Sequence, residues 1–400
     1  MDYRLSEHSR LEVGPLPPGD VRHLQRQHAG HIALRPGVGD SWVLQSNHHV
    51  GVIKLPSGSR IVVASKVPVQ NLLFMVAHTY DLVHFNKHQS RHGLQDEKTI
   101  ADVYVHVLLS WLELLIRKGL YKAYVPTVNA TPAIKGKFLI DQNLNSTTRF
   151  WCEYDDLTFS TQVNRILKSS LRHIIQQVPV SASLRSQALT YFRLLHPIDE
   201  VALSAKIFRQ VDYNRLNHHY QTLIDLCALI YTNSSLRDSG DGQAFSGFMA
   251  NMNRVFEQFM LKFIKQQMSG VRVSGGKKSN WAESFSADSY LPDIEPDIHI
   301  HGRYLIDTKY YTSPLNERGK LHSSHLYQML TYMRAYGLNG MLLYPKNEVD
   351  VDVSYLLEGQ YIRVRAVDLG GSLEKFQAEL LGLISDIRET FSRANHPVLP

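Results

Sequence analysis

The sequence predicts an α/β protein, α+β overall, with a β-rich and helical N-terminal part and a C-terminal part in which helices flank a central mixed sheet. Short β-rich runs separated by turn residues crowd the stretch from Ser41 to Val63. From residue 245 onwards, amphipathic helices alternate with short apolar strands, which is typical of an α/β arrangement. A polar segment rich in Ser, Gly and Asp, residues 233–243, separates the two parts and predicts a domain boundary.

Length and composition are those of an ordinary globular protein with more than one domain. The chain has 400 residues, 44% hydrophobic and 20% charged, and its net charge of +6 is compatible with a nucleic-acid partner. Cys152 and Cys227 lack metal or redox spacing, which favours a reducing compartment. The first ten residues do not resemble a signal peptide, and the longest apolar run, Val103 to Ile116, is too short for a bilayer. We therefore expect a cytoplasmic protein with no membrane partner.

The N-terminal part is expected to begin irregularly over residues 1–40, which are rich in Pro, Gly and His. Three β-rich runs (42–44, 50–53 and 60–63) predict a small antiparallel meander or barrel. Apolar residues at helical spacing then predict helices at 69–85, 100–119 and 161–178, with further helices to about residue 231. Residues 124–150 between them are polar and favour strands. We expect a partner-binding domain over residues 1–155 and a helical connector over residues 156–235.

The C-terminal part, residues 236–400, is expected to be the second large domain. Its predicted elements are a long helix at 245–268, a hairpin near residue 300, a helix at 322–336, strands at 340–344 and 361–367, and a helix at 373–391.

The predicted hairpin from Leu291 to Tyr311 carries the polar residues of greatest interest. Its second strand is apolar except for Asp307 and Lys309, which are costly to bury unless they pair with each other, a metal or a ligand. Because side chains alternate along a strand, Leu305, Asp307, Lys309 and Tyr311 share one face. The first strand opens with Asp297, directly after Pro296.

Two carboxylates and a lysine so arranged suit metal-assisted phosphodiester hydrolysis. Asp297 and Asp307 can hold a divalent cation, which acidifies a bound water, and Lys309 can steady the attacking hydroxide. The two acids share a face only if the connection has an odd number of residues or the hairpin carries a bulge. We expect a three-residue connection or a bulge at Gly302, which tolerates positive φ.

Other residues near the hairpin can complete the site, although each has an ordinary structural interpretation as well. Asp-x-Lys alone is common on surface strands. Glu257 lies on a helix just upstream and is either a third metal ligand or a surface charge. Gln328 and Tyr332 share a helix face and either act at the site or pack and cap the sheet end. Rivals for the first acid are Asp293 and Glu295. The His299-x-His301 pair can bind zinc only with a third ligand, and the sequence does not present one.

This constellation resembles the PD-(D/E)-x-K nuclease superfamily, and the Gln-x-x-x-Tyr pair resembles the extension of its RecB-like branch. The resemblance implies a restriction-endonuclease-like C-terminal domain with Mg²⁺ as the usual cofactor and Mn²⁺ as an alternative. It also implies six catalytic residues, the first three being metal ligands: Asp297, Asp307, Glu257, Lys309, Gln328 and Tyr332.

Most of the chain resembles the McrC family. The segments that carry this resemblance are Val50-Gly51-Val52-Ile53, Arg117-Lys118-Gly119-Leu120, Ile134-Lys135-Gly136-Lys137, Asn164-Arg165-Ile166-Leu167 and Met252-x-x-x-Phe256-Glu257. The resemblance implies a nuclease subunit of a modification-dependent, 5-methylcytosine restriction system that cuts double-stranded DNA. The implied partner is McrB, an AAA+ GTPase hexamer that reads methylcytosine. The N-terminal domain is implied to dock into the motor ring and to stimulate its GTP hydrolysis.

The sequence departs from the McrC pattern at two places. Lys135-Gly136-Lys137 stands where the family usually has Arg-Gly-Arg, and lysine keeps the charge but loses the bidentate fork. Glu295 stands where the family often has Arg. The chain shows no Gly-x-x-x-x-Gly-Lys-Ser/Thr motif, so any GTPase in the system must be another chain.

The basic connection at 270–279 is expected to lie near the DNA backbone through Arg272, Lys277 and Lys278. Two other functions stay open beside the restriction subunit. One is a stand-alone RecB-like repair or resolving nuclease, which would cut without an NTPase. The other is a non-catalytic adaptor that activates an AAA+ ring, although Asp297, Asp307 and Lys309 are all present.

Overall fold

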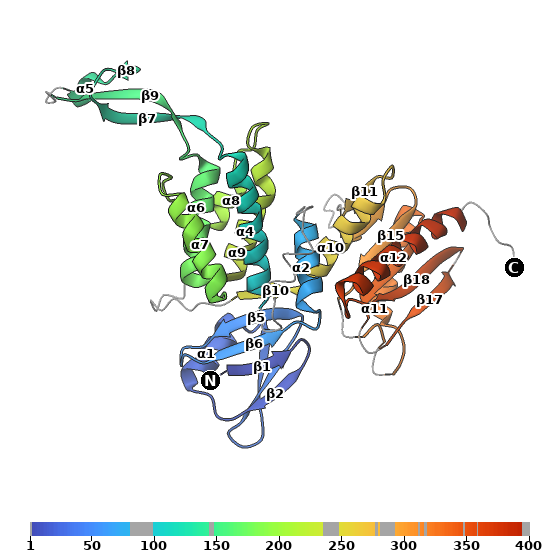
Figure 1. The fold of residues 1–400 in the computed structure, drawn as a ribbon. Helices are drawn as coiled ribbons and strands as arrows, with labels where there is room; N and C mark the ends of the chain where they lie inside the picture. The colour runs from blue at the N-terminus through green and yellow to red at the C-terminus, as the bar shows by residue number, and fades with distance from the viewer. Residues whose placement is uncertain are drawn as a thin grey trace, which may run out of the picture. The chain divides into compact units, whose positions relative to one another are not determined.

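The computed structural model describes residues 2–80, 99–143, 148–234, 248–276, 279–280, 293–310, 313–315, 318–346, 349–357 and 359–393. The chain forms two compact units (Figure 1). Unit 1 combines Met1–Val103 with Leu236–Pro400, and unit 2 is Tyr104–Ser235. The expected boundary at residue 235 coincides with the end of unit 2, whereas the expected boundary at residue 155 falls inside unit 2. The roles assigned to the three expected segments stay predictions.

The N-terminal segment of unit 1 forms two small sheets and a helix. The four-stranded sheet has the order β1 (Asp2–Ser6), β6 (Arg60–Ala64), β5 (His49–Lys54) and β10 (Phe248–Asn251). The three-stranded sheet has the order β2 (Arg10–Val13), β4 (Trp42–Ser46) and β3 (Ile32–Pro36), and α1 spans Pro18–Gln27.

Two expectations for this segment were wrong. Residues 1–40 are not irregular but contain strands β1, β2 and β3. The sequence misled because short strands with polar exposed faces have the composition of loops; in β1 only Leu5 is buried. The three β-rich runs also do not form one meander, because the first lies in β4 and the other two lie in β5 and β6, which belong to a different sheet.

The start of the long helix expected at 245–268 was also wrong. Residues Phe248–Asn251 form β10, which pairs antiparallel with β5, and α10 begins only at Met252 and ends at Gln267. The Asn251 side chain caps the helix by accepting a hydrogen bond from the Arg254 N–H at 3.3 Å. At Gly51 a Cβ would lie 1.8 Å from the Phe248 oxygen, so the glycine permits this close pairing. The chain therefore adds a strand to the N-terminal sheet before it enters the C-terminal part.

The central sheet of the C-terminal part is mixed, as expected, and has six strands. Its order is β11 (Val273–Gly275), β14 (Ile298–Ile300), β15 (Tyr304–Thr308), β16 (Asn339–Pro345), β18 (Gln360–Val367) and β17 (Asp352–Leu357). β15, β16 and β18 run parallel, and the remaining neighbours pair antiparallel. The edge strand β17 was missed because its residues are all exposed. A separate two-stranded ladder joins β12 (Ser279–Asn280) to β13 (Asp293–Ile294).

Helices cover both faces of this sheet. On one face, α11 (Ser323–Tyr336) packs Met329, Tyr332 and Met333 against a group of strand residues that includes Leu305, Leu342 and Ile362. α10 packs with α2 (Val69–Thr79), and α12 (Leu373–Arg393) contacts both α2 and β18. Asn71 of α2 is fully buried and donates to the Leu369 carbonyl at 2.9 Å. The N-terminal segment and the C-terminal part thus share one packed unit.

Unit 2 combines helices with a projecting hairpin (Figure 1). Most of α4 (Ile100–Lys118) belongs to it, with α6 (Gln162–Gln177), α7 (Ala182–Leu194), α8 (Ala205–Arg209), η1 (His218–Tyr220) and α9 (Gln221–Ser234). The hairpin is formed by β7 (Ala123–Thr131) and β9 (Phe150–Thr158), with β8 (Lys137–Phe138) and α5 (Ile140–Asn143) between them. Among the residues that the structure describes, no helix is long and apolar enough to cross a membrane.

Candidate active site

The connection between β14 and β15 has three residues, as the sequence predicted. Ile300 pairs with Tyr304, so His301, Gly302 and Arg303 form the turn, and Gly302 has a φ of 68°. Because Ile298 pairs with Ile306, the next position outward sets Asp297 opposite Asp307. The loop with an odd number of residues therefore sets the two acids opposite each other on neighbouring strands.

Asp307 and Lys309 form a close ion pair at the end of β15. The Lys309 Nζ lies 2.5 Å from Asp307 Oδ2, and the side chains are 19% and 1% exposed. The Lys309 backbone N–H donates to the Leu343 carbonyl at 2.8 Å, so the strand's pairing with β16 continues through Lys309. A charge this deeply buried is stable only when it is paired, and the lysine supplies that partner.

Asp297 is held beside this pair by the residue that separates its members. Its Oδ2 accepts hydrogen bonds from the Thr308 backbone N–H at 2.7 Å and from the Thr308 hydroxyl at 2.6 Å. Two donors on one oxygen fix the carboxylate's position before any ligand arrives. Asp297 is thereby anchored to β15 rather than only facing it.

Burial and neighbouring acids raise the pKa values of Asp307 and Glu257. Burial raises the pKa of Asp307 to about 6, with a further rise from Asp297 that Lys309 opposes. Burial also raises the pKa of Glu257 on α10 to about 7, helped by Asp297, Asp307 and Glu295 and opposed by Arg254. Glu257 is thus close enough to the hairpin acids for their charges to raise its pKa. Four carboxylates with such mutual repulsion form an environment that a cation stabilises.

The chemistry of these groups fits a hard divalent cation. Asp297, Asp307 and Glu257 offer carboxylate oxygens, which Mg²⁺ and Mn²⁺ prefer. Within the described part of the chain, no three His, Cys, Asp or Glu side chains already stand as a finished metal site. The fit therefore rests on donor type and on the crowded negative charge.

His299 and His301 are engaged in other contacts. Their rings stack with centroids 4.2 Å apart, and the His301 Nε2 lies 2.9 Å from the Ser274 Oγ. The His299 ring also lies 4.8 Å from the ring of Tyr336. These contacts agree with ordinary polar strand residues, the alternative to a zinc site.

Gln328 and Tyr332 meet on α11 as their spacing predicted. The Gln328 Nε2 donates to the Tyr332 Oη at 2.8 Å. The Tyr332 hydroxyl also bonds to the backbone of Glu295, two residues before Asp297. The pair therefore ties α11 to the segment that delivers the first acid. Of the rival acids, Glu295 lies close enough to raise the pKa of Glu257, whereas Asp293 pairs with Asn280 in the separate ladder.

Two residues near the ion pair were missed in the sequence. His325 on α11 places its Nδ1 2.8 Å from the Tyr344 Oη. Burial, followed by the charge of Lys309, lowers the pKa of His325 to about 4, and burial with Asp307 raises the pKa of Tyr344. The available signals were spacing alone: His325 precedes Gln328 by three helical residues, and Tyr344 follows Leu342 by two along β16.

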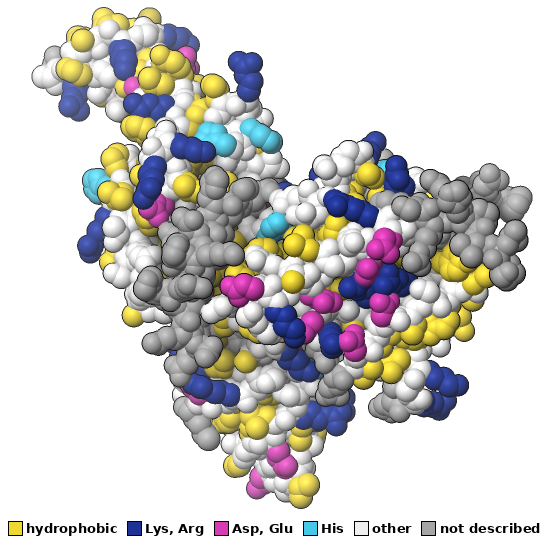
Figure 2. All heavy atoms as spheres, turned by 45° about the vertical axis from the view of Figure 1, so that its right-hand side comes forward, with side chains coloured by type: hydrophobic (Ala, Val, Ile, Leu, Met, Phe, Trp, Pro, Cys, Tyr) yellow, Lys and Arg dark blue, Asp and Glu magenta, His cyan; other side chains and the backbone are white. Residues whose placement is uncertain are grey.

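The expected DNA-contacting cations are only partly described. Arg272 is exposed and directly precedes the edge strand β11, while Lys277 and Lys278 lie outside the described residues. Figure 2 shows a face on which Lys and Arg side chains lie among Asp and Glu side chains instead of forming a separate basic field.

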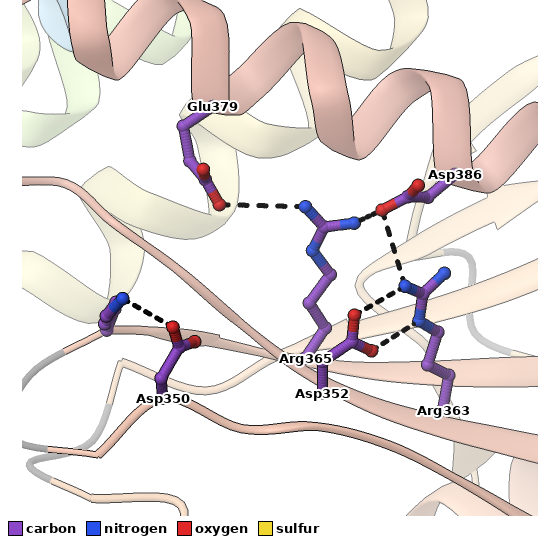
Figure 3. Close-up of polar contacts among 7 residues, drawn as sticks. Asp350, Asp352, Arg363, Arg365, Glu379 and Asp386 are labelled. Atoms are coloured by element: carbon purple, nitrogen blue, oxygen red, sulfur yellow. Dashed lines mark hydrogen bonds and ion pairs between the residues drawn. The ribbon is translucent and has the colours of Figure 1, made fainter.

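Opposite α11, charged residues fasten α12 to the sheet (Figure 3). Arg363 binds both Asp352 oxygens, at 2.8 and 2.7 Å, and reaches Asp386 of α12 at 3.4 Å. Arg365 pairs with the same Asp386 and lies 3.6 Å from Glu379. These residues support the sheet from the face that does not carry the ion pair.

The Lys135-Gly136-Lys137 segment lies in the hairpin of unit 2, where both lysines have acidic partners. The Lys135 Nζ lies 3.4 Å from Asp156 and 4.0 Å from the centre of the Tyr154 ring, and the Lys137 Nζ lies 3.3 Å from Glu153. Gly136 has a φ of 71°, and a Cβ there would lie 2.5 Å from the Glu153 oxygen. The glycine is therefore required by the turn.

Comparison with known proteins agrees with this architecture. Residues 44–345 match the sequence model of the family described as "McrBC 5-methylcytosine restriction system component". The chain is 25% identical over 341 residues to the "Type IV methyl-directed restriction enzyme EcoKMcrBC" of Escherichia coli K12, covering 80% of this chain and 98% of that protein.

The fold is also found among solved structures. A chain of the half-complex refined from a tetradecameric assembly of Thermococcus gammatolerans McrB AAA+ hexamers with bound McrC matches with a TM-score of 0.61 and 16% identity. The match covers 96% of this chain and 100% of that one. The family match spans most of the chain, and the protein therefore belongs to the McrBC 5-methylcytosine restriction system component family.

Proposed function

We propose that this protein is the Mg²⁺-dependent endonuclease subunit of a modification-dependent restriction complex that cuts double-stranded DNA. The observation that carries the proposal is the hairpin that joins Asp297, Asp307 and Lys309. Family membership and the likeness to a methyl-directed restriction enzyme support the substrate class.

In this proposal each residue has a distinct role. Asp297 and Asp307 would hold the cation, and Glu257 on α10 would be the third ligand. Bound magnesium supplies positive charge at the scissile phosphate and a more acidic water. Lys309 would balance the charge of Asp307 and orient the attacking water. Gln328 and Tyr332 keep the segment before Asp297 in place through the Glu295 backbone.

The partner in this proposal is a hexameric AAA+ GTPase, which contacts the hairpin of unit 2. The solved relative comes from an assembly of McrB hexamers with bound McrC. The hairpin exposes large apolar side chains: Tyr124 is 69% exposed, Ile134 62%, Ile140 69% and Leu157 50%. Exposed apolar residues on a projecting hairpin are typical of a docking element. Lys135 and Lys137 would meet the partner as point charges rather than as arginine forks.

The test is DNA cleavage by the full chain with its AAA+ partner, GTP, Mg²⁺ and methylated DNA. Asp307→Asn should reduce cleavage by at least ~100-fold, because it removes a metal ligand and the partner of Lys309. Asp352→Asn is the matched control, because it removes an exposed carboxylate paired with arginine in the same sheet and should cut normally. Full cleavage in EDTA would contradict the metal requirement.

The two other functions predict different results in the same assay. A stand-alone RecB-like nuclease would cut with Mg²⁺ alone and gain nothing from the GTPase. A non-catalytic adaptor would stimulate GTP hydrolysis, and complexes with Asp307→Asn would show the same residual cutting as the wild type.

A further inference from the structure

Glu7 is a buried acid far in sequence from the candidate active site, yet it lies against the catalytic strand. It follows β1, is 1% exposed, and continues the sheet by donating its N–H to the Ala64 carbonyl at 3.1 Å. Its Oε1 accepts hydrogen bonds from the Lys66 N–H at 2.9 Å and from the Tyr310 hydroxyl at 3.2 Å. The Glu7–Tyr310 contact joins residues 303 positions apart.

Tyr310 directly follows Lys309, so whatever holds its side chain also holds the end of the catalytic strand. The Tyr310 side chain is 8% exposed, and its ring centre lies 5.9 Å from that of Phe256 on α10. Phe256 directly precedes Glu257. A single buried tyrosine therefore touches the two elements that carry Lys309 and Glu257, and its hydroxyl is bound by the N-terminal sheet.

Burying a carboxyl group and a phenol hydroxyl between two packed layers costs desolvation free energy. Burial raises the pKa of Glu7, and burial together with Glu7 raises the pKa of Tyr310. An apolar pair of similar volume would pack at lower desolvation cost. A hydrogen bond differs from such packing because it fixes direction and distance, and in some proteins buried polar groups serve that specificity.

We propose that Glu7 is a positioning residue for DNA cleavage, which acts through Tyr310 on the placement of Lys309 and Glu257. The inference rests on the nuclease function proposed above. This role would make DNA cleavage depend on the N-terminal sheet. Strand β6 of that sheet ends at Ala64, and the backbone N–H of nearby Lys66 also donates to Glu7. Cleavage is then correct only while β1, β6 and β15 keep their mutual arrangement.

The first test removes only the hydroxyl group, with Tyr310→Phe in the full chain assayed with its AAA+ partner. The turnover rate for DNA should fall about tenfold, which corresponds to about 1.4 kcal/mol and so to the loss of one hydrogen bond that positions the catalytic strand. The KM for DNA, the stimulation of GTP hydrolysis and the thermal unfolding midpoint should stay near wild-type values.

The matched control is Tyr304→Phe, because Tyr304 is buried in the same strand and its hydroxyl donates to the Gly340 carbonyl at 3.1 Å. It loses a buried hydrogen bond of β15 without touching the N-terminal sheet. Tyr304→Phe should retain wild-type turnover. An equal loss in both variants would overturn the proposal, since any loosening of β15 would then explain it.

Variants of Glu7 give the second test. Glu7→Gln keeps an oxygen that can accept from Lys66 and Tyr310 and should preserve most of the turnover, whereas Glu7→Leu should match Tyr310→Phe. The double variant Glu7→Leu with Tyr310→Phe should be no slower than either single one. Additive losses of turnover in the double variant, or wild-type turnover in Glu7→Leu, would contradict the proposal.

Amide hydrogen exchange separates this inference from the proposed function. The Lys309 N–H, which bonds to the Leu343 carbonyl, should exchange faster in Tyr310→Phe than in Tyr304→Phe, whether or not DNA is cut. If the wild type cuts no DNA but exchange changes as expected, the nuclease function fails while the positioning contact stands. Unchanged exchange would overturn the contact's role even in an active nuclease.

Discussion

Single carboxylates decide the electrostatics of the hairpin. Asp307 is almost fully buried, and burial alone would favour its neutral form; Lys309 at 2.5 Å opposes that rise. Asp297 instead receives two hydrogen bonds from Thr308, which fix the position of its carboxylate. The two adjacent acids are thus held by different means, Asp307 by an ion pair and Asp297 by hydrogen bonds. This arrangement follows from Thr308 lying between Asp307 and Lys309.

Histidines of the N-terminal segment should make stability depend on pH. The His28 Nδ1 lies 3.2 Å from the His31 Nδ1, and burial, with His23 and His31, lowers the pKa of His28 to about 3. In the unfolded chain its pKa is near 6.5. The unfolded state therefore binds the proton first, so stability is full above about pH 6.5 and falls as the pH drops toward 3.

We expect His28→Gln to flatten this dependence. Between pH 7 and pH 5 the wild type should lose on the order of 1 kcal/mol of unfolding free energy more than the variant. Buried acids with raised pKa values, such as Glu7 and Asp307, act in the opposite direction and are common to both proteins. Chemical denaturation at each pH measures the difference, with the exposed His218→Gln as control. Parallel pH curves for wild type and His28→Gln would contradict the assignment.

At the scale of elements, ion pairs with arginines of β18 help to hold α12 on the sheet. Asp386 receives Arg363 and Arg365, whose side chains are 22% and 11% exposed (Figure 3). We expect Asp386→Ala to cost about 2 kcal/mol of unfolding free energy, because it leaves two partly buried guanidinium groups without their shared partner. Asp350→Ala is the control, since it breaks only an exposed pair with Lys346 and should leave the unfolding free energy near the wild-type value. Equal unfolding free energies for the two variants would show that the network is only a surface feature.

Elements with one strong periodic pattern could be predicted from the sequence, and elements defined by their neighbours could not. The helices α4, α6 and α11 matched to within a residue or two, because each has a continuous apolar face and α11 ends at Gly337 in the left-handed conformation. The strand β10 was missed because its apolar residues continue the pattern of α10. Only pairing with β5 across Gly51 identifies it.

In the candidate site, too, the residues on one local pattern could be predicted from the sequence, whereas contacts between distant segments could not. Asp297, Asp307 and Lys309 and the odd loop between the strands followed from local spacing and strand alternation. Contacts between distant segments did not: His325 with Tyr344, and Glu7 with Tyr310, are set by how helices and sheets pack. The roles of the site residues remain predictions for the experiments described above.

At the scale of the whole molecule, removing residues 1–155 is not a clean way to separate docking from cleavage. Those residues supply β5 and β6, to which β10 is added, and Asn71, which binds the Leu369 carbonyl. Such a truncation would expose the core of unit 1. The hairpin of unit 2 offers a smaller change, because β7 and β9 pair in register up to Thr131 and Phe150.

We therefore expect the two activities to separate when residues 132–149 are replaced by an Asn-Gly turn. A two-residue type I′ turn suits the facing ends of an antiparallel pair, so β7 and β9 should still form. The variant loses Lys135, Lys137 and the apolar Ile134 and Ile140, and should neither stimulate GTP hydrolysis nor cut in a GTP-dependent way. Asp307→Asn should do the reverse, stimulating the partner at the normal rate without cutting.

The measurement is a paired assay of GTPase rate and DNA cleavage for both variants, with circular dichroism to confirm folding. Normal stimulation by the shortened hairpin would place the docking surface elsewhere in the chain. Loss of stimulation in a folded Asp307→Asn complex would show that the nuclease site itself takes part in activating the motor.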